Sequence, residues 1–261
     1  MLIYACSESN NDVELENEDP STDVTIPLSL YQKIYKTTSE IYIEDGFVYI
    51  NTNGVPDHKS PYFPLDHVLH EAYDGSNPFV NNWNKNPNGI TTLNLRFKIP
   101  ISPKKASSST PPSMGPIGVS LNGVPFYNQY AGMNQPLTRE INSFDQGNGH
   151  PAPIAPGQEN GVDGRYHYHM EPILTSKEKG RNVILGFLLD GFPVYGPEEN
   201  GNIIISSDLD NYHGHSHGTS DFPSGIYHYH LTADDPYLNR IVYYGTTAKL
   251  KQKINLFLYY C

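Results

Sequence analysis

Apolar and polar positions alternate with a period of two in several short segments of this chain. Residues 41–43 and 47–50 are apolar runs on either side of Asp45-Gly46. An Asp-Gly pair between apolar runs is a strong hairpin signal, because these residues tolerate positive φ. Residues 91–99 also alternate, with four apolar side chains on one face. The pattern predicts short strands joined by turns.

An internal repeat occupies the second half of the chain, as three blocks in the same order. Residues 118–127 (GVSLNGVPFY) align with residues 186–195 (GFLLDGFPVY). A block with Phe-Asp and Gly-His, residues 144–150, matches residues 209–215, and Tyr-His-Tyr-His at 166–169 recurs at 227–230. Each copy therefore predicts a hairpin with an Asn-Gly or Asp-Gly turn, a loop carrying Asp and Gly-His, and a final Tyr-His-Tyr-His strand.

Composition agrees with these strand signals. Glycine and proline number 22 each among 261 residues, above their usual shares of about 7% and 5%. We predict a mainly β fold of antiparallel sandwich or barrel-like sheets, with an internal repeat, long loops and little helix. The expected parts are an acidic tether at 1–23, a β region at 24–110, the repeat domain at 111–247, which is continuous with 24–110 in one alternative, and a tail at 248–261.

Charge and cysteine content limit the partners. The net charge of −11 argues against nucleic acid, and two cysteines at the chain ends, Cys6 and Cys261, exclude a disulfide framework and a Cys-based zinc site. Residues 3–6, followed by a polar stretch, resemble the end of a bacterial lipoprotein signal. We expect an extracytoplasmic protein that contacts a membrane only through a lipid anchor, if Cys6 is lipidated. An acidic N-terminus with an incidental cysteine remains the alternative.

The Tyr-His-Tyr-His segments carry the candidate chemistry. In a strand, successive side chains point to opposite faces, so His167 and His169 share one face and the two tyrosines share the other. Residues two apart lie about 6.5 to 7 Å apart along a strand, and two imidazoles at that spacing can converge on one ion with bonds of about 2.0 Å. His228 and His230 repeat this arrangement.

Two histidines do not complete a site, and the repeat supplies further candidates. His150 and His215 occupy equivalent positions upstream of the two pairs. The predicted metal ligands are His150, His167, His169, His215, His228 and His230. Imidazole ligation without thiolates suits divalent transition metals, and copper or zinc is the expected ion. No phosphate-binding glycine motif is present.

Taken together, these motifs resemble the YHYH domain family, named for the tetrapeptide. The resemblance rests on residues 118–127, 149–151, 164–169, 184–197 and 208–235. It implies a β-rich fold and a secreted or periplasmic location. Residues 53–58 are similar to the family's N-terminal element, which adds His58 to the candidates. The candidates for supporting or additional ligands are Asp145, Asp210, His58, His213 and His217.

Three classes of function fit these residues. The first is a metal-binding protein that holds copper or zinc outside the cytoplasm. The second is a metalloenzyme with an open metal position for an unknown small-molecule substrate, either a hydrolase with Asp145 or Asp210 as general base or a copper oxidase that uses Tyr166, Tyr168, Tyr227 or Tyr229. The third is a surface module stabilised by metal. The number of ligands at the site decides between the first two classes.

Overall fold

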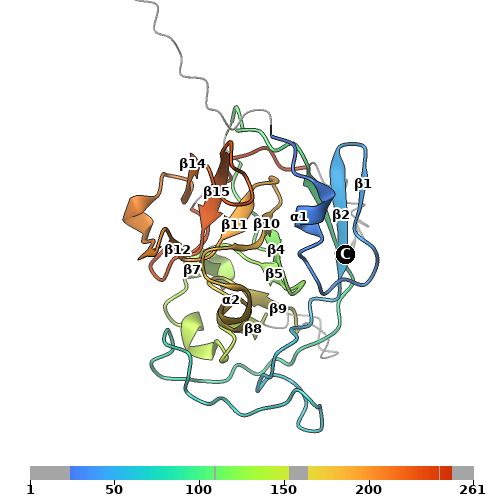
Figure 1. The fold of residues 1–261 in the computed structure, drawn as a ribbon. Coiled ribbons are helices and arrows are strands. Elements are labelled where there is room, and N and C mark those ends of the chain that lie inside the picture. Colours follow the sequence, from blue (N-terminus) through green and yellow to red (C-terminus); the bar gives the residue numbers. More distant parts are fainter. Residues whose placement is uncertain (1–23, 109, 153–163, 241, 249–261) are drawn as a thin grey trace, which may run out of the picture.

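The fold was obtained as a computed structural model, which describes residues 24–108, 110–152, 164–240 and 242–248. Strands make up 26% of it and helices 10%, and the described strands do not close into a barrel (Figure 1). The prediction of a mainly β fold with little helix is confirmed. No helix in the described part of the chain is long and apolar enough to cross a membrane. The predicted tether, residues 1–23, and the tail from residue 249 lie outside the described residues.

A mixed sheet of eight strands contains both repeats. Its order is β14-β15-β11-β10-β4-β5-β9-β8. In chain order the strands are β4 (Gly118–Ser120), β5 (Pro125–Phe126), β8 (Gly149–Pro151), β9 (Tyr166–Tyr168), β10 (Ile184–Leu188), β11 (Pro193–Tyr195), β14 (Gly214–His217) and β15 (Ile226–His230). The order reads the same from both ends when the repeats are exchanged, so a pseudo-twofold axis passes between β4 and β10.

Each repeat builds half of this sheet in the same way. The Asn-Gly or Asp-Gly turn closes the hairpin β4–β5 or β10–β11, with Gly123 at φ 75° and Gly191 at φ 98°. The Tyr-His-Tyr-His strand then pairs parallel to the second hairpin strand. The sheet is therefore mixed, whereas the sequence predicted antiparallel sheets. The long connection before each Tyr-His-Tyr-His strand permits the crossover that a parallel pair needs.

A smaller antiparallel sheet packs beside the large one (Figure 1). It contains β1 (Tyr42–Glu44), β2 (Phe47–Thr52) and β3 (Leu95–Pro100), and Asp45 and Gly46 form the expected turn with positive φ. The helix α1 (Leu28–Tyr31) lies beside this sheet. Buried apolar side chains from both sheets form one core, in which the ring centroids of Tyr31 and Phe187 lie 4.6 Å apart.

The remaining elements border the large sheet. Two short hairpins occupy equivalent places in the repeats, and one helix and three 3-10 turns fill connections. They are β6 (Tyr130–Ala131), β7 (Gln135–Pro136), β12 (Glu198–Glu199), β13 (Asn202–Ile203), α2 (Ile173–Lys179), η1 (Gly132–Asn134), η2 (Glu140–Ser143) and η3 (Ser206–Asp208). As shown below, the hairpin β12–β13 and the turn η2 each bring a carboxylate to a histidine cluster.

Burial of Asp190 makes stability depend on pH. Its carboxylate accepts hydrogen bonds from the Tyr229 hydroxyl at 2.6 Å and the Gly245 backbone N–H at 2.9 Å, and burial raises its pKa to about 6. The folded-state pKa exceeds the unfolded value of about 4, so the stability that this group contributes is complete below pH 4 and is lost as pH rises through 6. The loss amounts to at most about 3 kcal/mol.

Asp190→Asn is expected to abolish this loss, because the first repeat carries Asn122 at the equivalent position, where it bonds the hydroxyl of Tyr168. Urea unfolding of metal-free protein at pH 4 and pH 7 measures the difference between wild type and variant. A difference that stays constant between the two pH values would contradict the assignment. The ionisable groups nearest the carboxylate are the hydroxyls of Tyr227, Tyr229 and Tyr243.

Candidate metal centres

Three histidine side chains from β8 and β9 converge at one end of the large sheet. His150 lies directly opposite His167 in the strand register, and His169 follows two residues later on the same face. The Nε2 atom of His167 is 3.2 Å from that of His150 and 2.9 Å from that of His169. All three rings are buried. We call these residues the first cluster.

Hydrogen bonds fix which ring nitrogen faces the centre of the first cluster. The Nδ1 atom of His167 lies 2.9 Å from the carbonyl oxygen of Arg165, and that of His169 contacts the carbonyl oxygen of Asn128. A carbonyl only accepts, so these Nδ1 atoms carry the protons and the Nε2 lone pairs point inward. His150 Nδ1 lies 2.7 Å from Ser143 Oγ, which donates onward to the Glu140 carbonyl.

A second cluster forms at the opposite end of the sheet from β14, β15 and the hairpin β12–β13. His215 lies opposite His228, and His217 and His230 lie on the same face. The Nε2 atom of His215 is 3.2 Å from that of His217 and 3.1 Å from that of His230. Glu199 Oε1 is 2.6 Å from His217 Nε2 and within 3.7 Å of the other three. These five residues are the second cluster.

The second cluster shows the same control of the rings. Nδ1 of His228 contacts the Ile226 carbonyl at 3.0 Å, and Nδ1 of His230 contacts the Gly196 carbonyl at 2.7 Å. Gly196 and Asn128 are equivalent positions of the two repeats, 68 residues apart. The buried Nε2 atom of His228 makes no hydrogen bond within the described part of the chain. Its lone pair therefore points at the other Nε2 atoms without a proton between them.

Burial keeps the buried rings of both clusters neutral. It lowers the pKa of His150 and His167 well below the usual value, and lowers the pKa of His169 and of His230 to about 4. Neighbouring histidines lower several of these pKa values further. Protonation therefore does not readily remove the repulsion between the Nε2 lone pairs that face one another. A cation bound at the centre of each cluster would remove it.

The spacings suit a transition-metal ion. Four ligands in a tetrahedron with metal–nitrogen bonds of about 2.0 to 2.1 Å lie about 3.3 Å from one another. The neighbouring Nε2 atoms of both clusters are 2.9 to 3.2 Å apart, close to this value. The three Nε2 atoms of the first cluster, and the donor atoms of Glu199, His215, His217 and His228 in the second, each lie within 4.8 Å of one another. The donors in both places fit an ion.

Comparison with known proteins identifies the family of this chain. Residues 96–202 and 198–244 match the model of a family described as YHYH protein, and together cover more than half of the chain. The chain belongs to the YHYH protein family. The first range holds the first cluster, and the second range holds Glu199 and the histidines of the second cluster. Searches of curated proteins and of solved structures found no match.

The two clusters of this YHYH protein differ at two equivalent positions. Arg165 in the first repeat aligns with Ile226 in the second, so Ala152, which pairs with Arg165, stands where His217 stands. The first strands of the hairpins β6–β7 and β12–β13 align likewise, so Ala131 stands where Glu199 stands. The first cluster therefore lacks the two donors that the second cluster gains from its hairpin and from the end of β14.

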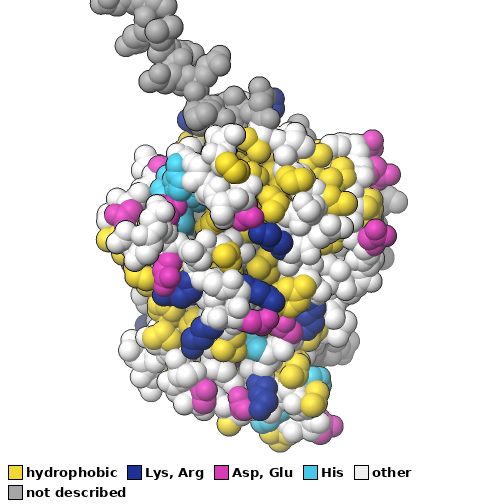
Figure 2. All heavy atoms as spheres, viewed as in Figure 1, with side chains coloured by type: hydrophobic (Ala, Val, Ile, Leu, Met, Phe, Trp, Pro, Cys, Tyr) yellow, Lys and Arg dark blue, Asp and Glu magenta, His cyan; other side chains and the backbone are white. Residues whose placement is uncertain are grey.

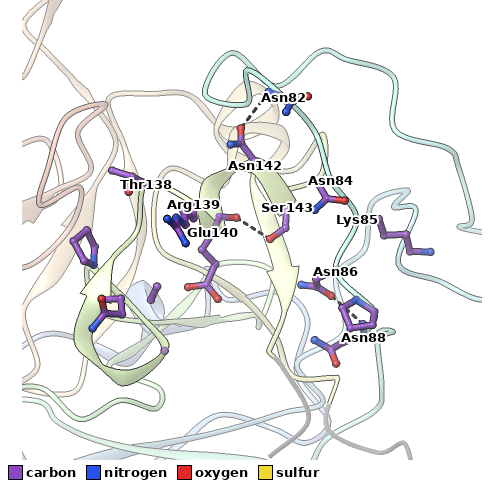
Figure 3. A pocket seen from close by; sticks show the side chains of 15 residues that line it. Asn82, Asn84, Lys85, Asn86, Asn88, Thr138, Arg139, Glu140, Asn142 and Ser143 are labelled. Carbon is purple, nitrogen blue, oxygen red and sulfur yellow. Dashed lines mark hydrogen bonds between the residues drawn. The ribbon is translucent and has the colours of Figure 1, made fainter.

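A carboxylate from a different element lies next to the first cluster. Glu140, in η2, places Oε1 3.5 Å from His150 Nε2, while its Oε2 is buried and has no hydrogen-bond partner in the described part of the chain. Burial raises the pKa of Glu140. The residue lines a cleft of about 890 Å³ together with Ser143 and Asn86 (Figure 3). These three side chains separate the histidines, none of which lines the cleft, from the solvent in it.

The aspartates that the sequence suggested as supporting ligands have another partner. Asp145 accepts hydrogen bonds from the Tyr166 hydroxyl at 2.8 Å and from Ser60, and Asp210 accepts one from the Tyr227 hydroxyl at 3.0 Å. The tyrosines lie on the opposite face of the strand from the histidines. Neither carboxylate bonds a ligand ring, so the structure gives no support to their roles as supporting ligands or as general bases.

The three supplementary histidines separate in the same way. His217 joins the second cluster, as described above. His58 lies on the tyrosine side, with Nε2 3.1 Å from the Tyr168 hydroxyl. His213 is a buried turn residue with φ 77°, whose Nε2 contacts Thr232, and its equivalent Asn148 also has positive φ, 69°. His58 and His213 therefore lie outside both clusters.

Sequence reasoning missed Glu199, Glu140 and Ser143. Glu199 directly precedes Asn200-Gly201, which form the turn of β12–β13 with φ 49° and 79°. An Asn-Gly turn next to two glutamates was visible in the sequence and could have indicated a hairpin with a carboxylate at its tip. Nothing in the spacing of Glu140 or Ser143 indicated that η2 packs against His150.

Proposed function

We propose that this protein is an extracytoplasmic metal-binding protein that holds two divalent transition-metal ions, one in each histidine cluster. The observation that supports the proposal best is the convergence of neutral Nε2 lone pairs whose rings are fixed by carbonyl groups. A ring oriented through its second nitrogen is the usual arrangement of a metal-ligating histidine. The order of the sheet places the clusters five strands apart, from β15 to β9, or about 24 Å at the usual strand spacing.

Copper and zinc are the proposed ions. The donors are imidazoles with a carboxylate at or beside each cluster, and no thiolate or thioether takes part among the described residues. Imidazole suits zinc and copper(II), and calcium prefers an all-oxygen shell. Location outside the cytoplasm rests on the lipoprotein-like start of the chain, and a lipid anchor at Cys6 is proposed on the same ground.

Metal content per chain tests the proposal. Protein purified without a histidine tag, reloaded with zinc or copper and desalted, should contain two equivalents by elemental analysis. His167→Ala and His228→Ala should each retain one equivalent, and the double variant none. The matched control is His67→Ala, because His67 is exposed and stacks on Phe63 away from both clusters. Unchanged metal content in a folded double variant would refute the proposal.

Ser143→Ala should weaken the first site and spare the second. The hydroxyl lies 2.7 Å from Nδ1 of His150 and donates its own hydrogen bond to the Glu140 carbonyl, so its loss removes a contact that orients that ring. Loss of such a partner typically lowers metal affinity about 10- to 100-fold. Competition with a chelator of known affinity measures both sites. Equal weakening of the two sites would show that the variant acts through general stability and not through His150.

A further inference from the structure

The two clusters differ in their access to solvent, and this difference bears on how metal enters and leaves. In the first cluster the rings of His150, His167 and His169 are 1%, 2% and 3% exposed. In the second cluster the side chains of His215, His217 and Glu199 are 25%, 35% and 20% exposed. Histidine side chains reach the molecular surface near β14, at the upper left of Figure 2.

A small pocket leads to the second cluster. It has a volume of about 190 Å³, and Glu199, His217 and His230 form part of its wall. Hydroxyl and amide groups of Thr219, Ser220, Asn182 and Asn200 form much of the remainder. A small polar ligand in this pocket would touch three metal donors directly. The large cleft near the first cluster ends instead at Glu140, Ser143 and Asn86 (Figure 3).

The second cluster also has two donors more than the first. Four of its donor atoms, from Glu199, His215, His217 and His228, lie within 4.8 Å of one another, the number of ligands that zinc in proteins usually has, and His230 Nε2 lies 3.1 Å from His215 Nε2. Its inner donors, His228 and His230, are buried, whereas the three others lie at the surface. The exposed donors can therefore leave the ion one at a time while the buried histidines still hold it. The first cluster has no such exposed donors, because Ala131 and Ala152 stand in place of Glu199 and His217.

We infer that the second cluster is the site at which metal is loaded and released, through a transient complex with a small nitrogen- and oxygen-donating chelator in the pocket at Glu199 and His217, and that the first cluster retains its ion. This inference rests on the proposed function. The exchange is a substitution of ligands without a redox change. The chelator would bond the ion as Glu199 and His217 detach in turn, and the ion would leave with the chelator when His215, His228 and His230 release it.

Kinetics of metal release test the inference on the full chain. Zinc-loaded protein with two measured equivalents is mixed with a chromophoric chelator in excess, and release is followed by absorbance. Two phases of one equivalent each are expected, a fast one from the second cluster and a slow one from the first. The slow phase should be about 10- to 100-fold slower, because the residues around a metal site control access to it. His228→Ala should lack the fast phase and His167→Ala the slow phase. Free L-histidine, as a small N,O-chelator, should accelerate only the fast phase, in proportion to its concentration.

Glu199→Gln and Thr219→Val separate donor from pocket effects. The glutamine variant removes the carboxylate donor and should alter the fast phase alone. The valine variant removes a hydroxyl from the pocket wall at almost constant side-chain volume, removes no metal donor, and should weaken the response to L-histidine. The inference is overturned if both ions leave at one rate, if the fast phase disappears in His167→Ala, or if L-histidine has no effect on it. Absence of bound metal at the start would instead refute the proposed function, so the two failures are distinguishable.

Discussion

Asp145→Ala is expected to lower the free energy of unfolding by about 3 to 5 kcal/mol. The substitution leaves several buried hydrogen-bond donors without an acceptor, and each such donor costs about 1 to 3 kcal/mol. The carboxylate of Asp145 is fully buried. It accepts hydrogen bonds from Ser60 Oγ, from the Tyr166 hydroxyl at 2.8 Å and from the backbone N–H of Gly147 at 2.8 Å. Alanine supplies none of these acceptors.

Asp210→Ala is the matched control for this prediction. Asp210 occupies the equivalent position of the second repeat and accepts hydrogen bonds from the Tyr227 hydroxyl and from the backbone N–H groups of Tyr212 at 2.8 Å and Gly214 at 3.1 Å. It is exposed, however, so water can replace the lost acceptor. We expect a loss below about 2 kcal/mol, because bonds to water largely replace exposed hydrogen bonds. Urea unfolding of the metal-free proteins gives both values.

The result also decides between two roles for these aspartates. If the aspartates only hold the tyrosine hydroxyls on the face opposite the histidines, Asp145→Ala should be less stable. The fraction of this variant that folds should still bind two metal ions. Asp145→Asn, which keeps one acceptor, should fold more readily and serve for the metal analysis. Retained stability together with the loss of one metal equivalent would mean that Asp145 supports a ligand after all, as the sequence pattern suggested.

The misplaced aspartates show where sequence reasoning reached its limit. Side chains alternate between the two faces of a strand, so His167 and His169, which are two residues apart, could be predicted to lie on one face and converge. Asp145 lies only five residues before His150, but the chain turns between them. The backbone N–H of Asp145 donates to the carbonyl of Gly149 across that turn, and Asn148 has positive φ. Proximity in sequence therefore said nothing about the side of the sheet.

Whether the chain forms one metal site or two depends on the order of the strands in the sheet, and the internal repeat alone did not predict that order. Two copies of a motif could have met at a pseudo-twofold axis to share one ion. Instead, the hairpin strands β4 and β10 pair at the centre of the sheet, so the strands that carry the histidines lie toward its two edges. Glu199 is a further case, because the hairpin β12–β13 brings its carboxylate to His215 and His217, a long-range contact without a local signal.

Removal of metal is expected to destabilise the protein by about 4 kcal/mol for each site that is held at a thousandfold excess over its dissociation constant. The strands that carry the outer histidines, β8 and β14, are the edges of the large sheet, and each pairs with a single neighbour. An ion that joins His150 to His167 and His169 adds a cross-link between an edge strand and its neighbour. Without it, the facing lone pairs repel and the edge strand is held by three residue pairs.

Thermal unfolding after prolonged dialysis against a chelator measures this effect, with hydrogen exchange to locate it. Faster exchange should appear at residues 149–151 and 214–217 and not in the central strands β4 and β10. The double variant His167→Ala and His228→Ala serves as control, since its melting temperature should not respond to the chelator. A response of equal size in that variant would show that the chelator acts elsewhere. No response in the wild type would mean that the clusters are held by hydrogen bonds alone, with one ring of each pair donating from Nε2.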